Sequence, residues 1–477
     1  MINTEEAYVM RENASNYVLE LMERARSAQA IAERFSQARV DELTEAIVYN
    51  VTRPEFAQKL AEFTVEESQM GVVEHKYGKI MTKSKGALRD MKGEKSVGVV
   101  EVDEAKGMIT LAKPMGVIAA LAPCTNPEAT PVVKATSAVK TRNAIIIAPH
   151  PRTKKTNQMV IDNIRQTLKK YGAPEDLVIA IDPDQVSIDV SNELMKQADF
   201  IMATGGSGMV KSAYSSGTPA IGVGVGNAVT IVDGTTDLDI TANDIMRSKT
   251  FDHATSCSAE NSCIVNADHY EAFIEKLEIQ GAFIVREGSK EKQMLESGMW
   301  HDGHLNKDIV AQSPESIAKI AGLDVPEETK FFVVEESGIG KAYPFSGEKL
   351  SVVMTLYKYT QFEEALKTLN DIMHYQGLGH SCGIHTTNEG HILRLAKTAK
   401  ASRIMVNQPQ CLANSGAWTN GMPMTMSLGC STWGGNSVSH NVTWKDFLNY
   451  TYVSSPIEST QPTDEQLFSP EIISANS

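Results

Sequence analysis

Apolar positions in the first 90 residues recur at helical spacing. One stripe at intervals of three and four residues comprises Tyr17, Leu21, Met22, Ala25 and Ala28. A second stripe covers residues 40–48 and follows Ser36, a residue type that commonly caps helix N-termini. This periodicity predicts two amphipathic helices whose apolar faces pack against a sheet.

The pattern changes to that of strands near Val97. Residues 96–102 and 108–112 are rich in β-branched and apolar residues, and they flank the polar segment 103–107. This arrangement predicts a β-hairpin with a five-residue turn. The pattern is compatible with a hairpin that serves an oligomer interface and, nearly as well, with a hairpin that is simply exposed on the surface.

Between residues 116 and 250, strands and helices alternate. The expected strands are 116–121, 144–148, 177–181 and 200–204, and the expected helices are 128–138, 155–171, 185–197 and 207–214. Continuous apolar strands joined by helices indicate a parallel sheet that is covered on both faces. We therefore predict an α/β, doubly wound nucleotide-binding domain whose ligands lie at the carboxyl ends of the strands.

A second α/β unit is expected after residue 257. Its elements are strands 263–265, 330–334, 351–356 and 403–406 and helices 268–280 and 361–373. From residue 454 onward the chain is rich in Ser, Thr, Pro and Glu. That composition predicts a solvated tail, because it offers little apolar surface to bury.

Composition narrows the class of protein. The 477 residues are 42% hydrophobic, which is enough for a large core divided over two or three domains. The net charge of −14, with acidic and basic residues interspersed, argues against a nucleic-acid partner. No charged-then-apolar leader and no run of 18 apolar residues occurs, so we expect a cytoplasmic protein without a membrane partner.

Cys257 is the first candidate for chemistry. The six cysteines show no CxxC pair and no regular spacing, which fits a reducing compartment and argues against a zinc site or any other metal site. Cys257 lies in the polar stretch 251–262, whereas packed cysteines usually lie among aliphatic residues. A nucleophilic thiol needs polar neighbours and access to its substrate.

Asn126 is the second candidate. It lies between Pro123 and Pro127, directly after the strand 116–121. The segment is either a simple turn or a loop that points an amide donor at a reacting carbonyl oxygen, as in an oxyanion hole.

Two further loops follow predicted strands. His150, Pro151 and Arg152 begin a basic segment, which is either a solvated charge run or a contact for a ribose or a 2′-phosphate. Thr204, Gly205 and Gly206 lead into a predicted helix, a setting that suits a phosphate group. The spacing of these glycines is not that of the G-x-G-x-x-G dinucleotide fingerprint.

Taken together, these segments resemble the aldehyde dehydrogenase superfamily, and they are most similar to its CoA-acylating branch. The matching segments, in the order found in that family, are Pro123–Pro127, Thr204–Gly206, Gly222–Asn227, the Cys257 stretch, Glu348–Ser351 and Trp433–Ser437. The resemblance covers roughly residues 15–455 and includes acylating dehydrogenases for sulfoacetaldehyde and succinate semialdehyde.

The resemblance implies roles for individual residues. Cys257 falls on the family's nucleophile, and Asn126 falls on its oxyanion-hole amide. Glu348 falls on the carboxylate that holds the nicotinamide ribose, although Val352 stands where many relatives have proline. The implied cofactor contacts are His150, Pro151, Arg152, Thr204, Gly205, Gly206, Gly224 and Glu348.

Val223 is the most informative departure from the hydrolytic branch, which carries a general-base glutamate at this position. Because valine accepts no proton, attack of water on an enzyme thioester loses assistance of roughly 10²–10⁴-fold. The acyl group is then expected to await a thiol, namely coenzyme A. His380 matches a histidine that is suspected of proton transfer in acylating relatives, and a purely structural role fits equally well.

The expected protein is an NAD(P)-dependent, CoA-acylating aldehyde dehydrogenase, with NADP slightly favoured by the basic segment after His150. Its aldehyde is small and anionic, sulfoacetaldehyde before succinate semialdehyde, with acetaldehyde as a neutral alternative. A hydrolytic aldehyde dehydrogenase, a phosphate-linked semialdehyde reductase and a non-catalytic assembly protein are more distant alternatives. The expected assembly is a homodimer or a homotetramer.

The resemblance also implies a division of the chain. The expected parts are a cofactor-binding domain (1–96 and 113–248), an oligomerisation element (97–112 and 438–453), a catalytic domain (249–437) and a polar C-terminal tail (454–477).

Overall fold

The N-terminal region is helical, as the apolar stripes predict. The computed structural model describes residues 4–476 and begins with α1 (Thr4–Ala32), α2 (Gln37–Val51), α3 (Pro54–Ser68) and α4 (Val73–Met91). Ser36 caps α2, since its side-chain oxygen accepts a hydrogen bond from the Arg39 amide at 3.2 Å. The buried stripe of α1 packs against a sheet, which confirms the interpretation of the first 90 residues.

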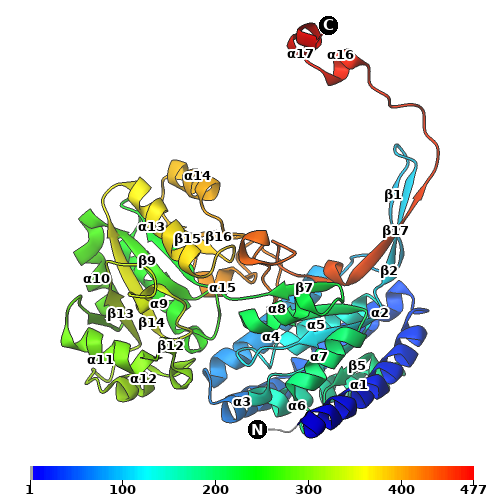
Figure 1. Cartoon of the computed structure of the whole chain (residues 1–477), viewed down its shortest axis with the longest axis horizontal. Coiled ribbons are helices and arrows are strands. Elements are labelled where there is room, and N and C mark those ends of the chain that lie inside the picture. The colour runs from blue at the N-terminus through cyan, green and yellow to red at the C-terminus, as the bar shows by residue number, and fades with distance from the viewer. Residues whose placement is uncertain (1–3, 477) are drawn as a thin grey trace.

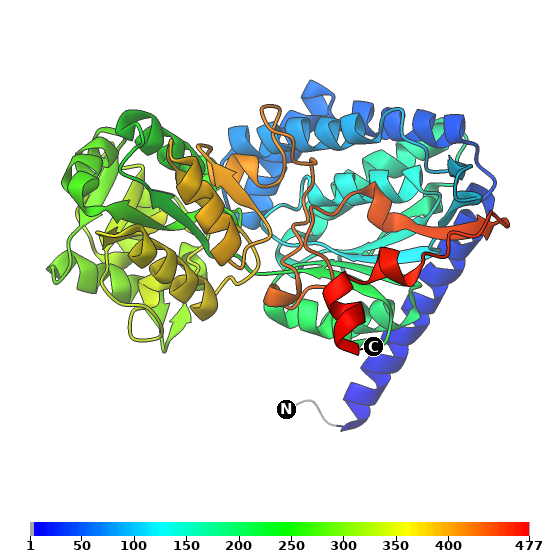
Figure 2. The ribbon, with the colours of Figure 1, turned by 90° about the horizontal axis from the view of Figure 1, so that it is seen from above.

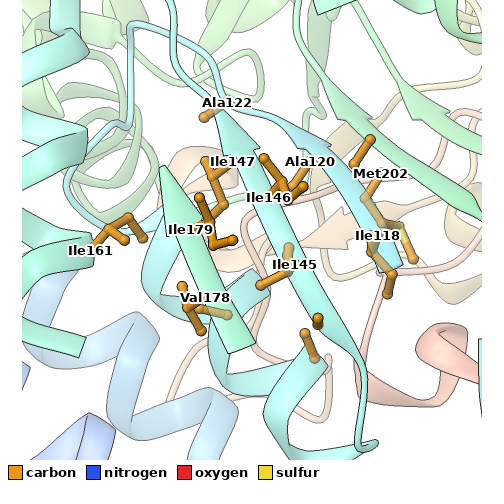
Figure 3. Close-up of a cluster of buried hydrophobic side chains, with 14 of the residues drawn as sticks. Ile118, Ala120, Ala122, Ile145, Ile146, Ile147, Ile161, Val178, Ile179 and Met202 are labelled. Atoms are coloured by element: carbon orange, nitrogen blue, oxygen red, sulfur yellow. The ribbon is translucent and has the colours of Figure 1, made fainter. Parts of the chain in front are cut away.

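That sheet has five parallel strands in the order β5-β4-β3-β6-β7. The strands are β3 (Val117–Leu121), β4 (Ala144–Ala148), β5 (Val178–Ala180), β6 (Phe200–Thr204) and β7 (Ala220–Val223), and the linking helices are α5 (Thr130–Lys140), α6 (Lys154–Lys170), α7 (Ile188–Gln197) and α8 (Ser207–Ser215). Helices cover both faces, so the strands are apolar throughout, and Figure 3 shows Ile118, Ile146 and Met202 in the core between them.

A second sheet of seven parallel strands forms the other α/β unit, in the order β10-β13-β14-β9-β8-β15-β16. Its strands are β8 (Ala228–Val232), β9 (Glu260–Asn266), β10 (Ala282–Val285), β13 (Phe331–Glu335), β14 (Val353–Tyr359), β15 (Cys382–His385) and β16 (Ile404–Val406). Its helices are α9 (Leu238–Thr250), α10 (Tyr270–Ile279), α11 (Lys290–Met299), α12 (Pro314–Ala321), α13 (Phe362–Tyr375) and α14 (Glu389–Thr398).

The boundary expected at residue 248 is wrong in one respect. Strand β8 pairs with β9 and β15 in the second sheet, and α9 packs on β9 and β13. The chain therefore passes from one unit to the other between β7 and β8, at residues 224–227, rather than after α9. The local pattern did not reveal this, because β8 is as apolar as the strands of the first sheet.

The predicted hairpin consists of β1 (Gly98–Asp103) and β2 (Met108–Pro114), and β17 (Leu448–Ser454) joins it as a third antiparallel strand. Figure 1 shows this three-stranded sheet projecting beside the first unit, with the C-terminal segment running on from it. That segment is almost entirely exposed and ends in the short helices α16 (Asp464–Leu467) and α17 (Pro470–Asn476). The predicted tail is therefore solvated.

The two α/β units lie side by side, and the segments 224–227 and 407–447 pass between them (Figures 1 and 2). This places the carboxyl ends of β3 and β6 opposite the loop that precedes β9. No helix within residues 4–476 is both long and apolar enough to cross a membrane.

Candidate active site

A cavity of about 680 Å³ opens between the two units. It brings together eight residues singled out from the sequence, namely Asn126, His150, Thr204, Gly205, Gly206, Gly224, Cys257 and Glu348. Pro151, Arg152 and His380 do not line it. Pro151 and Arg152 are exposed in a 3₁₀ turn (Pro151–Thr153), and His380 lies behind Cys257.

Cys257 is half-buried in the loop between the 3₁₀ turn Phe251–Ala254 and β9. Its Sγ lies 3.0 Å from Nε2 of His380. Burial raises the pKa of the Cys257 thiol, and the nearby Glu348 carboxylate raises it further. The free thiol therefore needs a proton acceptor in contact with it before it can act as a nucleophile.

His380 is fully buried just before β15. Its Nδ1 lies 2.9 Å from Ser381 Oγ, and burial together with the charge of Arg403 lowers the pKa of its imidazole to about 3. The ring is therefore neutral near pH 7. With its proton on Nδ1, directed at Ser381, the ring leaves Nε2 free to accept the proton of the thiol.

Asn126 lies in the loop between β3 and α5, with its side chain lining the cavity. Lys79 Nζ of α4 donates a hydrogen bond to Asn126 Oδ1 at 2.6 Å, while Asn126 Nδ2 donates to Thr125 Oγ1 at 3.3 Å. The oxygen end of the amide is thus held by an ammonium group. The second N–H of the amide remains available for a ligand oxygen.

Glu348 approaches the same centre from the loop before β14. The Gly226 amide donates to Glu348 Oε1 at 3.2 Å, and burial raises the pKa of the Glu348 carboxyl to about 8. Glu348 is the only carboxylate among the described residues that line the cavity. Val223, at the end of β7, also lines it and is buried.

The loop after β6 fits the pyrophosphate of a dinucleotide. Thr204 ends the strand, and α8 begins at Ser207 with Gly206 at its N-cap position. A side chain at Gly206 would meet no atom within 4 Å, so the space in front of the helix N-terminus is open. Free amides and the positive end of a helix dipole suit a phosphate there.

The loop after β4 offers less support for a 2′-phosphate. His150 lines the cavity, and burial together with Arg152 lowers the pKa of its imidazole. Glu67 of α3 caps the first turn of α6, because its carboxylate accepts hydrogen bonds from the amides of Lys155 and Thr156 at 2.8 and 2.7 Å. A negative charge at this position opposes the basic segment that favours NADP.

Three cations of the cavity wall were missed from the sequence, namely Lys79, Lys83 and Arg247. Lys83 is buried and donates to the carbonyl oxygens of Ser415 and Gly416 at 3.1 and 2.7 Å, and Arg247 lies nearer the solvent. The spacing of Lys76, Lys79 and Lys83 was the available signal, because residues three, four and seven apart share one face of a helix. Among the side chains that the structure describes, residues 11–476, no group has the composition and geometry of a metal site.

Comparison with known proteins identifies the family. The sequence model of the aldehyde dehydrogenase family matches residues 6–298. The chain is 44% identical over 457 residues to a sulfoacetaldehyde dehydrogenase of Acholeplasma sp., covering 94% of this chain and 93% of that one. It is 40% identical to an acylating sulfoacetaldehyde dehydrogenase of Cupriavidus necator, covering 95% of this chain and 92% of that one.

A solved structure agrees with this assignment. The crystal structure of an acetylating aldehyde dehydrogenase from Geobacillus thermoglucosidasius has a TM-score of 0.91 and 35% sequence identity, covering 95% of this chain and 99% of that chain. The aldehyde dehydrogenase fold predicted from the motifs is therefore confirmed.

Proposed function

The chain belongs to the aldehyde dehydrogenase family, and we propose that it is the CoA-acylating enzyme that interconverts a small anionic aldehyde and its acyl-CoA with NAD(P). The observation that carries this proposal is the wall of the cavity around Cys257. Val223 occupies the position of the hydrolytic base, and Glu348, the one carboxylate among the described lining residues, accepts a hydrogen bond from the Gly226 amide.

The first half-reaction begins with the proton of the Cys257 thiol. His380 Nε2, at 3.0 Å, accepts this proton as the sulfur attacks the carbonyl carbon of the aldehyde. The carbonyl π electrons move to the oxygen, and the resulting oxyanion accepts hydrogen bonds from Asn126 Nδ2 and from the Cys257 amide. The product of this step is a thiohemiacetal on Cys257.

The dinucleotide has a suitable site along the same cavity. Gly205, Gly206 and the N-terminus of α8 would hold its pyrophosphate, and Glu348 would hold the ribose next to the nicotinamide, which would supply the hydride acceptor. As the oxyanion collapses to a carbonyl, Cys257 retains the acyl group as a thioester. The basic segment after His150 favours the 2′-phosphate of NADP, whereas the Glu67 carboxylate at the start of α6 repels it. NAD is therefore as suitable as NADP.

In the second half-reaction, the thiol of coenzyme A attacks the thioester carbonyl. Asn126 and the Cys257 amide hold the oxyanion again, and Cys257 leaves as a thiol. Water competes poorly, because Val223 cannot accept its proton and Glu348 is held by Gly226. The kinetics are therefore ping-pong, and the cycle is reversible.

For the substrate, we favour sulfoacetaldehyde over succinate semialdehyde and acetaldehyde. Relatives that cover nearly the whole chain carry this activity in their names. The cavity wall also contains the cations Lys83 and Arg247, and Lys83 forms no ion pair with a described carboxylate. A buried ammonium without a counter-ion favours a substrate that supplies a negative charge.

For the assembly, we favour a homodimer or a homotetramer that uses the three-stranded sheet. The outer strands β1 and β17 expose Val99, Val102, Tyr450, Tyr452 and Val453. An exposed apolar sheet with free edges favours pairing with another chain. Light scattering on the purified protein would measure the mass, and a monomer would contradict this assignment.

The test of the activity is a panel assay. Sulfoacetaldehyde, succinate semialdehyde and acetaldehyde are each incubated with NAD or NADP and with CoA, phosphate or neither. We expect reduced cofactor to accumulate over many turnovers only with CoA, and to accumulate fastest with sulfoacetaldehyde. Multiple turnovers without CoA would refute the acylating assignment.

The nucleophile is tested on the same panel. Cys257→Ala is expected to abolish turnover in both directions, and mass spectrometry should find an acyl adduct on Cys257 of the natural protein when CoA is omitted. The matched control is Cys263→Ala, because Cys263 is buried within β9 away from the cavity. Substantial activity of Cys257→Ala would refute the mechanism.

A further inference from the structure

Four charged side chains form a buried cluster at the cavity wall, which one of them, Lys79, lines. Lys76 and Lys79 of α4 lie between Glu128 and Asp252, and all four are buried. Asp252 Oδ2 lies 2.9 Å from Lys76 Nζ and 2.5 Å from Lys79 Nζ. Glu128 is 3.1 Å from Lys79 and 3.8 Å from Lys76, so two positive and two negative charges balance one another.

We propose that Lys79 is a positioning residue that joins the two halves of the oxyanion hole. Its ammonium links the Asn126 amide to the Asp252 carboxylate, and Asp252 holds the turn that presents the backbone amide of Cys257. This inference rests on the proposed function, since it assigns a role within the same site. The hydrogen bonds and ion pairs of Lys79 go to Asn126, Asp252, Thr255 and Glu128 and not to Cys257, so it acts through its partners.

The first partner is the amide of Asn126. Because Lys79 donates to Asn126 Oδ1 at 2.6 Å, the amide oxygen faces the cluster and its N–H groups face the opposite way. This contact prevents the amide from flipping, which would direct an oxygen at the developing oxyanion. A positive charge on the amide oxygen also polarises the group and makes its N–H a stronger donor.

The second partner is the turn before Cys257. Asp252, His253 and Ala254 all adopt positive φ (52°, 49° and 58°), a left-handed conformation that is strained for residues other than glycine. Asp252 fixes this turn through Oδ1, which accepts the Val72 amide at 2.8 Å, and through Oδ2, which accepts Thr255 Oγ1 at 2.7 Å.

The pair of Lys79 and Asp252 is stabilised in its charged form, because the pKa of each group is shifted away from neutrality by its partners. Burial lowers the pKa of Lys79, but Asp252 and Glu128 more than offset this effect and raise it overall. For Asp252, burial raises the pKa of the carboxyl, and the two lysines outweigh burial and lower it. The link between Asn126 and the Cys257 turn is therefore a permanent one.

Lys76 provides a matched comparison within the cluster. It is as buried as Lys79 and pairs with the same two carboxylates, but its remaining hydrogen bond goes to the Thr125 carbonyl at 2.7 Å. Lys76 thus binds the backbone of the loop at Thr125, whereas Lys79 binds the side-chain amide of Asn126. A merely structural cluster would make the two lysines equivalent in catalysis.

The experiment is a double-mutant cycle between Lys79 and Asn126, with kcat and KM measured in the CoA-dependent assay. Removing one oxyanion donor typically costs ~10²–10³-fold in kcat, and we expect Asn126→Ala to show this loss. Lys79→Met should lose on the order of 10-fold to 10²-fold in kcat with KM within about threefold, because it weakens the same donor. The variant Lys79→Met/Asn126→Ala should be hardly slower than Asn126→Ala.

Three results would overturn the inference. They are multiplicative losses in the double variant, a kcat for Lys79→Met close to that of the natural protein, and equal kcat losses for Lys76→Met and Lys79→Met. Both lysine variants are expected to lower the melting temperature, since each unbalances the cluster. If Lys79→Met does not fold, Lys79→Gln serves in the same cycle, because it keeps a donor for Asn126 but removes the charge.

Failure of the proposed function gives a different result. In that case the natural protein would show no CoA-dependent turnover, and Asn126→Ala would have no activity to reduce. If the natural protein is active and Asn126→Ala is impaired, an additive cycle refutes the role of Lys79 alone.

Discussion

The sulfur of Cys257 lies 3.0 Å from Nε2 of His380, a residue 123 positions further along the chain. The two residues come from loops that precede different strands, β9 and β15, on either side of β8 in the second sheet. Burial keeps this imidazole neutral, with a pKa of about 3, so a proton acceptor is in contact with a thiol that burial itself makes a weak acid.

The first prediction concerns this contact. His380→Gln is expected to lower kcat/KM by roughly 10²–10⁴-fold, because the substituted side chain cannot accept the thiol proton. The pH dependence of Cys257 alkylation by iodoacetamide should shift to higher pH in the variant. An unchanged alkylation profile would leave His380 with a structural role only. His385→Gln is the control, since His385 is buried at the far end of β15, the strand that follows His380, and does not line the cavity.

The second prediction concerns stability in acid. The unfolded chain binds a proton at His380 below its ordinary pKa of about 6.5, whereas the folded protein does not until about pH 3. The stability present above pH 6.5 is therefore lost as the pH falls, by about 2 kcal/mol between pH 6.5 and pH 5. Urea unfolding at these two values should show a smaller loss for His380→Gln. An equal loss in the natural protein and in His380→Gln would contradict a buried, neutral His380.

The third prediction concerns the close approach of Gly226 to the nucleophile loop. A Cβ at residue 226 would lie 2.0 Å from the Cys257 carbonyl oxygen and 3.1 Å from Cys257 Cβ. Gly226→Ala must therefore displace Cys257 and should lower kcat by more than about 10²-fold, since small displacements of a reacting group are costly. Gly421→Ala, where a Cβ meets nothing within 4 Å, is the control. Similar kcat values for the two variants would contradict the geometry.

The fourth prediction concerns the anionic end of the substrate. Lys83→Met should raise KM for sulfoacetaldehyde by roughly 10-fold to 10²-fold, because a charge-assisted hydrogen bond is lost. KM for acetaldehyde serves as the internal control and should change little. Burial lowers the pKa of Lys83 to about 8, so KM for the anionic aldehyde should rise as the pH passes above that value. An equal rise for both aldehydes would exclude Lys83 as the anion contact.

The fifth prediction concerns water. Val223→Glu places a carboxylate on the cavity wall, and it should raise CoA-independent formation of the free acid by about 10-fold or more. Val223→Gln is the matched control, because the glutamine side chain has nearly the size of glutamate and is also polar, but it cannot act as a base. Equal acid formation by the two variants would show that the absence of a base is not what protects the thioester.

Much of the fold was predictable because local patterns are strong in a covered parallel sheet. Strands β3, β4 and β6 are buried at nearly every position, so their apolar runs are unmistakable in the sequence. The assignment of β8 to a sheet was not predictable. An apolar strand carries no local signal for its neighbours, and β8 pairs with β9 and β15 only after long connections.

Local sequence determined the chemistry that the site contains. It supplied a thiol in a polar segment, an amide between two prolines, a bare helix N-terminus and a valine at the position of the hydrolytic base, because each of these properties belongs to a residue and its immediate neighbours. Only the tertiary structure decided how these groups cooperate. The contact of His380 with Cys257 and the burial of Lys79 against Asn126 join segments far apart in the chain, and the environment that sets their charge and orientation exists only once the segments have packed together.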